Sequence, residues 1–140
     1  MEVNKVKKPV YSKKSKIEGR GVFSSRDIKK GEEIIRYEGD KILKSEGDIR
    51  SEKQLKKGHL YIFGLNKKYD IDGNKNGNIA KYINHSCSPN CETVTYDNKE
   101  IWIVALKKIK QNEELTYDYK LTGDISIACK CGSSRCVKRI

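Results

Sequence analysis

The chain has 140 residues, 36% of them hydrophobic, with a mean hydropathy of −0.78 and a formal net charge of +11. It is long enough to bury the core of one globular domain, and no apolar run approaches the roughly 20 residues that span a bilayer. The N-terminus is basic but lacks the apolar segment of a secretion signal. We therefore expect an intracellular protein, located in the cytoplasm, nucleoid or nuclear chromatin, with export as an effector by another route left open.

The positive charge lies mainly at the two ends of the chain. Residues 1–16 hold six Lys and one Glu, and residues 120–140 hold five basic residues and one acidic residue. Residues 17–119 carry 19 basic and 17 acidic residues and are therefore nearly neutral. The ends are either solvated and compositionally biased segments, or basic arms that contact nucleic acid or an acidic partner.

The first part of the sequence predicts short strands, glycine turns and one helix. Residues 1–16 form a flexible arm or an edge strand, and the two glycines within residues 17–23 predict a tight backbone bend. Residues 28–39 predict a turn followed by a β-branched strand that ends at a glycine. Residues 46–57 carry few apolar positions and predict a short exposed helix.

The second part of the sequence predicts further strands. Residues 61–63 and 69–72 indicate two short strands, the second closed by a Gly-Asn turn. Residues 101–106 are too apolar for a half-exposed strand, whereas residues 114–119 alternate between apolar and polar. Many short strands with little helix predict a compact, mainly β domain of the α+β class.

The five cysteines divide into two groups. Cys129, Cys131 and Cys136 form a C-x-C-x4-C cluster, while Cys87 and Cys91 share an earlier loop. In an intracellular chain such cysteines are metal ligands or thiols more often than disulfides. The three clustered thiolates leave one position of a tetrahedral zinc site open, which either loop cysteine can fill. The alternatives are the histidine of the same loop as fourth ligand, an iron–sulfur cluster, or reduced surface thiols.

Five segments of the chain resemble, in order, the motifs of the SET-domain protein lysine methyltransferases. Residues 18–23 (EGRGVF), 37–39 (YEG), 77–91 (GNIAKYINHSCSPNC) and 114–119 (ELTYDY) are similar to the family's HGRGLF, EYxG, GNxAxxINHSCxPNC and ELTYDY segments. The cysteine cluster is similar to the post-SET segment. The resemblance covers residues 17–140 and points to the trithorax and mixed-lineage-leukaemia type, in a minimal form without a pre-SET segment.

The resemblance implies a fold and a division of the chain. The fold is a SET domain of several short β-sheets with a threaded C-terminal segment and a zinc-binding post-SET tail. We expect a basic N-terminal arm at residues 1–16, the SET domain at residues 17–122 and the post-SET tail at residues 123–140.

The resemblance also implies a reaction, the transfer of a methyl group from S-adenosylmethionine to a lysine ε-amine, and the residues that support it. The residues expected to bind the cofactor are Glu18, Arg20, Gly21, Tyr61, Asn84, His85 and Lys130. The residues expected to bind one structural zinc ion are Cys87, Cys129, Cys131 and Cys136. This assignment leaves Cys91 as a buried, inert cysteine.

Three tyrosines would form the catalytic channel. Tyr119 would orient the amine and the sulfonium at the transfer point, and Tyr37 would line the same channel. The Tyr117 hydroxyl would hold the amine or a water, leaving little room for an already methylated lysine, so mainly monomethylation is predicted, with slow dimethylation left open. The neutral form of lysine costs about 4.6 kcal/mol at pH 7, and an apolar channel lowers that cost by desolvating the ammonium.

The expected substrate is a basic protein tail, from a histone, a histone-like DNA-packaging protein or a ribosomal protein. A chain at +11 repels such a tail, so either acidic residues line the groove or the basic ends bind nucleic acid that carries the substrate. The acidic candidates are Glu38, Asp40, Glu46 and Asp48. The sequence gives no indication of an oligomeric state.

The alternative reading is a catalytically silent, zinc-stabilised SET module that binds nucleic acid or a protein partner. A binding module does not need the polar and aromatic residues that the methyl transfer requires. All of them are present here, which favours the enzyme: Asn84, His85, Tyr117 and Tyr119.

Overall fold

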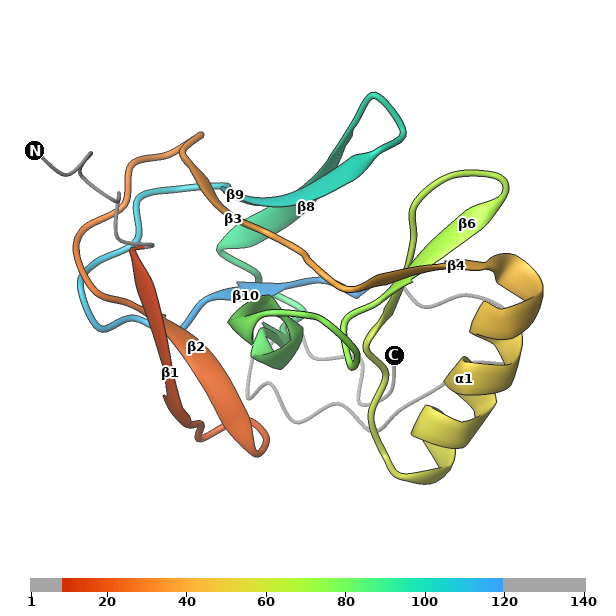
Figure 1. Cartoon of the computed structure of the whole chain (residues 1–140). Helices are drawn as coiled ribbons and strands as arrows, with labels where there is room; N and C mark the ends of the chain where they lie inside the picture. The colour runs from red at the N-terminus through yellow and green to blue at the C-terminus, as the bar shows by residue number, and fades with distance from the viewer. Residues whose placement is uncertain (1–8, 120–140) are drawn as a thin grey trace, which may run out of the picture.

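The structure, a computed structural model, describes residues 9–119. Within this range the chain forms four small β-sheets, helix α1 (Lys44–Lys56) and the short 3-10 helix η1 (Ile79–Tyr82) (Figure 1). Helix α1 packs beside strands β4 and β6 at one end of the fold, while β1 and β2 lie at the other end. The predicted mainly β, α+β class is confirmed. No helix in residues 9–119 is long and apolar enough to cross a membrane.

The first three strands of the described region, β1 to β3, belong to two antiparallel sheets. Strand β1 (Val10–Lys14) pairs antiparallel with β2 (Arg20–Ser24). A three-stranded antiparallel sheet has the order β3 (Glu33–Arg36), β9 (Glu100–Ala105) and β8 (Cys91–Tyr96). Its central strand β9 is the apolar segment that was predicted to be buried.

The other two sheets lie closer to helix α1 and to the cysteine loop. A second three-stranded antiparallel sheet has the order β4 (Asp40–Leu43), β6 (Tyr69–Asp72) and β5 (Ile62–Gly64). Strands β7 (Asn84–His85) and β10 (Thr116–Tyr117) form a short parallel pair. This pair brings two motifs that are far apart in the sequence side by side.

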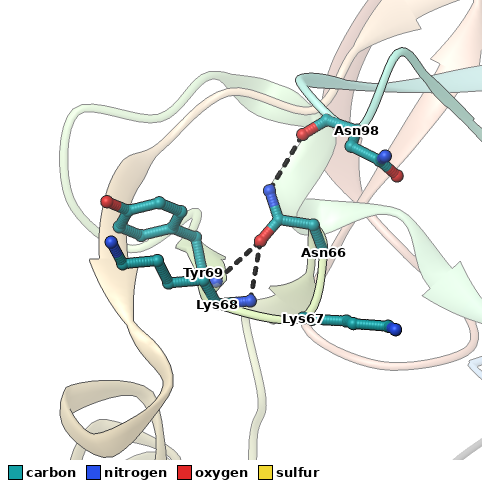
Figure 2. Close-up of a pocket in the computed structure, with 5 residues that line it drawn as sticks. All are labelled: Asn66, Lys67, Lys68, Tyr69 and Asn98. Atoms are coloured by element: carbon teal, nitrogen blue, oxygen red, sulfur yellow. Dashed lines mark hydrogen bonds between the residues drawn. The ribbon is translucent and has the colours of Figure 1, made fainter.

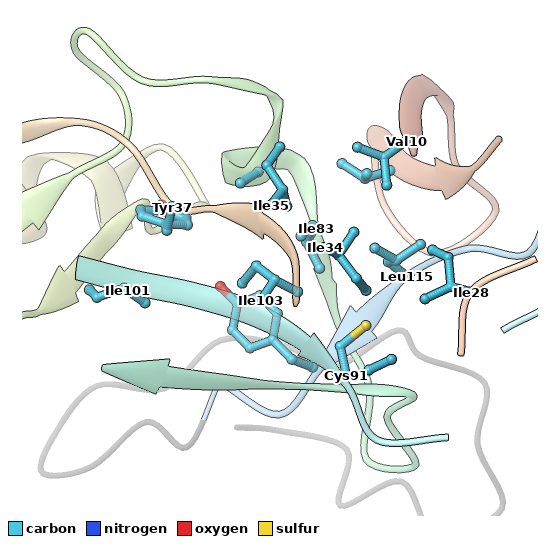
Figure 3. Close-up of a cluster of buried hydrophobic side chains, with 14 of the residues drawn as sticks. Val10, Ile28, Ile34, Ile35, Tyr37, Ile83, Cys91, Ile101, Ile103 and Leu115 are labelled. Atoms are coloured by element: carbon cyan, nitrogen blue, oxygen red, sulfur yellow. The ribbon is translucent and has the colours of Figure 1, made fainter. Parts of the chain in front are cut away.

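The core is built from β-branched side chains of the central strands. Ile35 of β3 faces Ile103 of β9 across the sheet, and Ile103 is fully buried. Ile83 and Leu115, which precede β7 and β10, complete the cluster in Figure 3. Burying each of these side chains contributes about 1.5–3 kcal/mol, so this core fixes the position of the parallel pair above it.

Helix α1 was predicted at residues 46–57 and lies within two residues of that range. Glu46 in its first turn and Lys53 and Lys56 in its last turn complement the helix dipole. Beyond its last residue, Gly58 has a positive φ of +83° and donates its N–H to the Leu55 carbonyl. Six of the 13 helix residues are exposed and only Gly47 and Gln54 are buried.

Several elements differ from the prediction. The predicted strand at residues 114–119 is only two residues long, because Glu114 forms an isolated bridge to Phe23 instead of joining a ladder. Strands β2, β4, β7 and β8 and helix η1 were not predicted, since their segments are short, polar or, in β2, close to the glycine bend, and form through long-range pairing. The predicted edge strand at the N-terminus is present as β1, and residues 1–8 and 120–140 lie outside the described residues.

Asn90 joins the cysteine loop to the segment that carries β10. Its Oδ1 accepts the Thr116 N–H at 2.9 Å, and its Nδ2 donates to the Glu114 carbonyl at 2.8 Å and the Glu113 carboxylate at 3.0 Å. An asparagine side chain imitates a strand edge in this way, with one acceptor and one donor group. Residues 77–91 and 114–119 are therefore joined by the Asn90 side chain as well as by the pairing of β7 with β10.

Candidate active site beside the Asn84-His85 strand

A continuous row of aromatic rings lies beside the parallel strand pair. The ring of Tyr37, just after β3, is 4.7 Å from that of Phe63 in β5, measured between centroids. Phe63 is 5.6 Å from Tyr117, and Tyr117 is 5.0 Å from Tyr119. Residues from β5, β10 and the end of β3 thus meet in one apolar, tyrosine-rich cluster.

Two of these tyrosines donate their hydroxyl hydrogens to main-chain carbonyl groups. Tyr37 Oη lies 2.5 Å from the Tyr61 carbonyl oxygen, and Tyr119 Oη lies 2.7 Å from the Ile83 carbonyl oxygen. A tyrosine hydroxyl has one hydrogen to donate, so both oxygens retain only acceptor capacity. The pair is therefore suited to bind a group that donates hydrogen bonds, such as an amine.

The hydroxyls of the cluster stay protonated at neutral pH. Burial raises the pKa of Tyr37, Tyr117 and Tyr119 above the ordinary tyrosine value, and the neighbouring tyrosines raise it further. Neutral phenols leave this cluster of rings without a fixed charge.

Asn84 lies at the junction of three segments beside this cluster. Its Nδ2 is 3.1 Å from the Glu18 carbonyl, 3.2 Å from the Arg20 carbonyl and 3.0 Å from the Glu114 carboxylate. The buried amide also lies 3.2 Å from the hydroxyl of Ser15. Three residues predicted to bind the cofactor, Glu18, Arg20 and Asn84, are therefore in direct contact.

The sequence interpretation missed two residues of this junction. Glu114 accepts hydrogen bonds from Ser15 Oγ at 2.9 and 2.8 Å through its two carboxylate oxygens. Gly21 leaves the space for this side chain, because a Cβ there would overlap the Glu114 carboxylate. Gly21 was expected to let the cofactor approach closely, and this contact is a separate reason for a glycine at the same position. Glu114 opens the ELTYDY segment, so its position was visible in sequence, whereas no local signal marks Ser15.

His85 connects the tyrosine cluster to the cysteine loop. Its Nδ1 accepts the Tyr119 main-chain N–H at 3.0 Å, and its Nε2 lies 3.4 Å from Cys87 Sγ. Burial lowers the pKa of His85, while the carboxylate of Asp118 acts in the opposite direction. The neutral ring therefore carries its hydrogen on Nε2 and directs it at the Cys87 sulfur.

A basic and aromatic surface flanks Asn84. The Arg20 guanidinium lies 5.9 Å from the centre of the Tyr82 ring. The Lys81 ammonium lies 5.0 Å from the same ring and 5.6 Å from the Tyr61 ring. Two cations and two aromatic faces therefore lie together on this surface, a combination that can bind a carboxylate and a flat aromatic base. Tyr61, predicted at the cofactor, is thus brought to the same surface as Arg20.

The two loop cysteines have different environments. Cys91 is buried in the core, and burial raises the pKa of its thiol to about 12. Cys87 is half-buried, and its sulfur lies 3.4 Å from Nε2 of His85. The remaining predicted ligands and the predicted cofactor contact in the tail lie outside the described residues: Cys129, Cys131, Cys136 and Lys130.

Two surface depressions lie elsewhere on the described part of the chain. One of about 420 Å³ lies between two hairpin turns, where Asn66 Nδ2 donates to the Asn98 carbonyl at 3.0 Å, and its wall includes Tyr69 (Figure 2). The other, of about 250 Å³, is an apolar hollow beside Trp102 and Ile34. Neither contains a residue of the tyrosine cluster, so neither is the candidate active site.

Comparison with known families decides the assignment. The SET domain family matches residues 19–120 of the chain. The chain belongs to the SET-domain family. This match covers the tyrosine cluster, the Asn84 junction and the parallel strand pair, and it confirms the family predicted from the motifs.

Individual relatives agree with this assignment. The chain is 40% identical, over 96% of its length, to the "Histone-lysine N-methyltransferase, H3 lysine-4 specific" of Emericella nidulans. It is 42% identical, over 89% of its length, to the "Histone-lysine N-methyltransferase trithorax" of Drosophila virilis, and 41% identical, over 92%, to the "Histone-lysine N-methyltransferase trr" of Drosophila melanogaster. The predicted trithorax type is confirmed.

A solved structure has the same fold. A humanized mutant of the Chaetomium thermophilum Polycomb Repressive Complex 2 aligns with a TM-score of 0.70 and 33% identity, over 81% of this chain and 15% of that chain. The chain spans only 12%, 3% and 6% of the three curated relatives' own lengths. The match therefore concerns the SET domain and not the larger proteins as wholes.

Proposed function

We propose that this SET domain is a protein-lysine N-methyltransferase that uses S-adenosylmethionine and acts on a basic protein tail. The observation that carries the proposal is the contact between two halves of one site. Tyr119 donates its main-chain N–H to His85 and its hydroxyl to the Ile83 carbonyl, so the tyrosine row ends directly at the Asn84-His85 strand. A lysine channel and a cofactor surface would meet at this point.

The tyrosines of the channel would prepare the lysine amine for attack. Their apolar surroundings lower the cost of the neutral amine, which is about 4.6 kcal/mol at pH 7 in water. The acceptor oxygens of Tyr37 and Tyr119 would take the amine N–H groups and leave the nitrogen lone pair free to point along the channel. The lysine ammonium would first lose a proton to solvent, because only the neutral amine has a lone pair. S-adenosylmethionine would supply an electrophilic methyl group, so that an N–C bond would form as the C–S bond breaks.

Tyr117 supports a limit of mainly one methyl group per lysine. Its side chain is buried between Phe63 and Tyr119. In the proposed channel its hydroxyl would occupy space that a methylated amine needs. Replacement by phenylalanine removes one oxygen atom and enlarges the channel. The variant Tyr117→Phe is expected to raise the share of dimethylated product, measured by mass spectrometry against the wild type.

The C-terminal tail would bind one structural zinc ion together with the cysteine loop. Cys87 is the loop thiol suited to join Cys129, Cys131 and Cys136, since Cys91 is buried in the core. In the proposed arrangement, metal binding docks residues 123–140 onto the cysteine loop. One zinc per chain is expected by elemental analysis in the wild type and in Cys91→Ser, and less in Cys87→Ser. Equal zinc content in both variants would contradict the assignment.

The proposed substrate is a histone or histone-like tail, in chromatin or on packaged DNA. The relatives whose names include histone-lysine N-methyltransferase support this class. Two acidic candidates for the groove, Asp40 and Glu46, both bond the Arg50 guanidinium and are therefore partly neutralised. This pairing favours the second explanation of the positive charge, in which the basic ends of the chain contact nucleic acid.

The test is methyl transfer from labelled S-adenosylmethionine to a panel of histones and bacterial or viral DNA-packaging proteins. Labelled lysine in the wild type, with a loss of about tenfold or more in Tyr119→Phe, is expected. The matched control is Tyr96→Phe, since Tyr96 is an exposed tyrosine on β8. If the wild type neither transfers a methyl group nor binds the cofactor by calorimetry, the chain is a silent binding module and the proposal is wrong.

A further inference from the structure

Helix α1 has one polar side chain that is buried against the sheet. Gln54 is only 6% exposed, in a helix whose other buried residue is Gly47. Asp72, at the end of β6, is 1% exposed and faces Gln54. Buried polar groups are costly unless they are hydrogen-bonded, so the partners of these two side chains indicate what they hold in place.

Gln54 uses both ends of its amide. Its Nε2 donates to Asp72 Oδ1 at 3.1 Å, and its Oε1 accepts the main-chain N–H of Tyr61 at 2.8 Å. The side chain therefore connects α1 to the segment that enters β5 from the helix. A glutamine with both groups bonded at good distances has a single orientation in this site.

Asp72 fixes the other side of this contact. Its Oδ1 also accepts the Asn74 N–H at 2.9 Å, and its Oδ2 accepts from Arg50 Nη1 at 3.1 Å. Arg50, one turn before Gln54 on α1, further contacts Asp40 and Glu46. The inner face of α1 is thus joined to β4 and β6 by a network that ends at Gln54.

The Tyr61 peptide groups carry this connection into the tyrosine cluster. While the Tyr61 N–H binds Gln54, its carbonyl oxygen accepts the Tyr37 hydroxyl at 2.5 Å and the Gly73 N–H at 2.9 Å. The position of the Tyr61 main chain therefore decides where the Tyr37 hydroxyl hydrogen points. A shift of this carbonyl would release the hydrogen and turn the Tyr37 oxygen into a donor toward the channel.

We infer that Gln54 is a positioning residue for methyl transfer: through the Tyr61 main chain it holds the Tyr37 hydroxyl as an acceptor for the lysine amine. The inference rests on the proposed function, because it concerns the same channel. Gln54 itself does not touch the channel, and the path runs through one hydrogen bond on each side of Tyr61. A Tyr37 hydroxyl free to donate would compete for the amine lone pair that must attack the methyl group.

The experiment compares Gln54→Met, which is similar in size but lacks both hydrogen-bonding groups, with Tyr37→Phe and the double variant. For the full chain, kcat and KM are measured on the substrate found with the histone panel. Exchange of the Tyr61 amide hydrogen is followed by NMR. The control is Gln111→Met, because Gln111 is the other glutamine of the chain and is exposed. Cofactor affinity and unfolding temperature are measured for every variant.

Gln54→Met is expected to lower kcat by about three- to tenfold, with cofactor affinity within about twofold of the wild type. Its Tyr61 amide should exchange about tenfold faster or more. In the Tyr37→Phe background the same substitution should change kcat by less than about twofold, since the hydroxyl it positions is absent.

Two results would overturn the inference while leaving the proposed function intact. One is an unchanged Tyr61 exchange rate in Gln54→Met. The other is an equal loss of kcat in the presence and absence of the Tyr37 hydroxyl, which would mean a general structural effect. A wild type without methyl transfer and without cofactor binding would instead refute the proposed function, and the positioning role would fall with it.

Discussion

The Asn84 amide offers the sharpest test of how the active site is held together. Its Nδ2 lies within 3.0–3.2 Å of the Glu114 carboxylate, the Ser15 hydroxyl and the carbonyl groups of Glu18 and Arg20. Asn84→Asp has nearly the same shape but replaces the donor with a carboxylate oxygen. It therefore places a second negative charge against Glu114 in a buried position.

The expected loss of stability follows from the number of N–H groups that the Asn84 side chain can donate. One amide group has two N–H donors, so it satisfies two of the four acceptors well at any moment. A bond to the carboxylate is worth about 1.5–3 kcal/mol and a bond to a neutral acceptor about 0.5–1.5 kcal/mol. Asn84→Ala should therefore cost about 2–4 kcal/mol of stability, or on the order of 10 °C in Tm. Asn84→Asp should cost more at neutral pH, because it adds charge repulsion to the lost bonds.

The assay is urea unfolding of both variants and the wild type at pH 7.5 and pH 5. Asn84→Asp should recover part of its loss at pH 5, since the introduced carboxyl takes up a proton and can donate again, whereas Asn84→Ala should show no such recovery. The control is Asn74→Ala, at an exposed asparagine, with an expected change within about 0.5 kcal/mol. Equal losses for the two Asn84 variants at both pH values would refute the reasoning, because they would show that Glu114 does not interact with this amide.

Three further predictions concern the core and the channel. Gly73→Ala should lower methyl transfer and cost about 1–3 kcal/mol of stability, since its Cβ would lie 2.5 Å from the Tyr37 hydroxyl. Gly64→Ala, which has more space, should be tolerated. Activity and Tm are measured for both variants. Burial raises the pKa of Cys91 to about 12, above the ordinary cysteine value of 9.0, so the unfolded chain loses this proton at a lower pH than the folded chain. The free energy of unfolding should therefore fall between about pH 9 and pH 12, by about 1.4 kcal/mol per pH unit. In denaturant titrations, Cys91→Ala should not show this fall in the free energy of unfolding between about pH 9 and pH 12. Ile103→Ala should cost about 2–5 kcal/mol in the same titration, and a loss under 1 kcal/mol would mean that the core relaxes around the cavity.

The sequence determined the family and the strand-rich class, and it singled out many of the candidate site residues. Tyr119, Asn84 and His85 stand inside contiguous motifs, and contiguous motifs are readable because their chemistry depends on spacing along the chain. Helix α1 and strand β9 were also predictable, since a polar segment of that composition and a strand of β-branched residues reflect local preference.

Only the tertiary structure decided which distant residues complete the site. Ser15 and Glu114 are 99 positions apart and meet because β2 and the segment before β10 are joined by the bridge between Phe23 and Glu114. Only the burial of Cys91 in the structure distinguishes it from Cys87, which lies four residues earlier in the same loop. Gln54 was part of a helix correctly expected to be exposed, and its contact with the Tyr61 main chain appears only once the helix packs on the sheet. Local sequence encodes preferences and motifs, whereas these contacts depend on long-range packing, which no local pattern specifies.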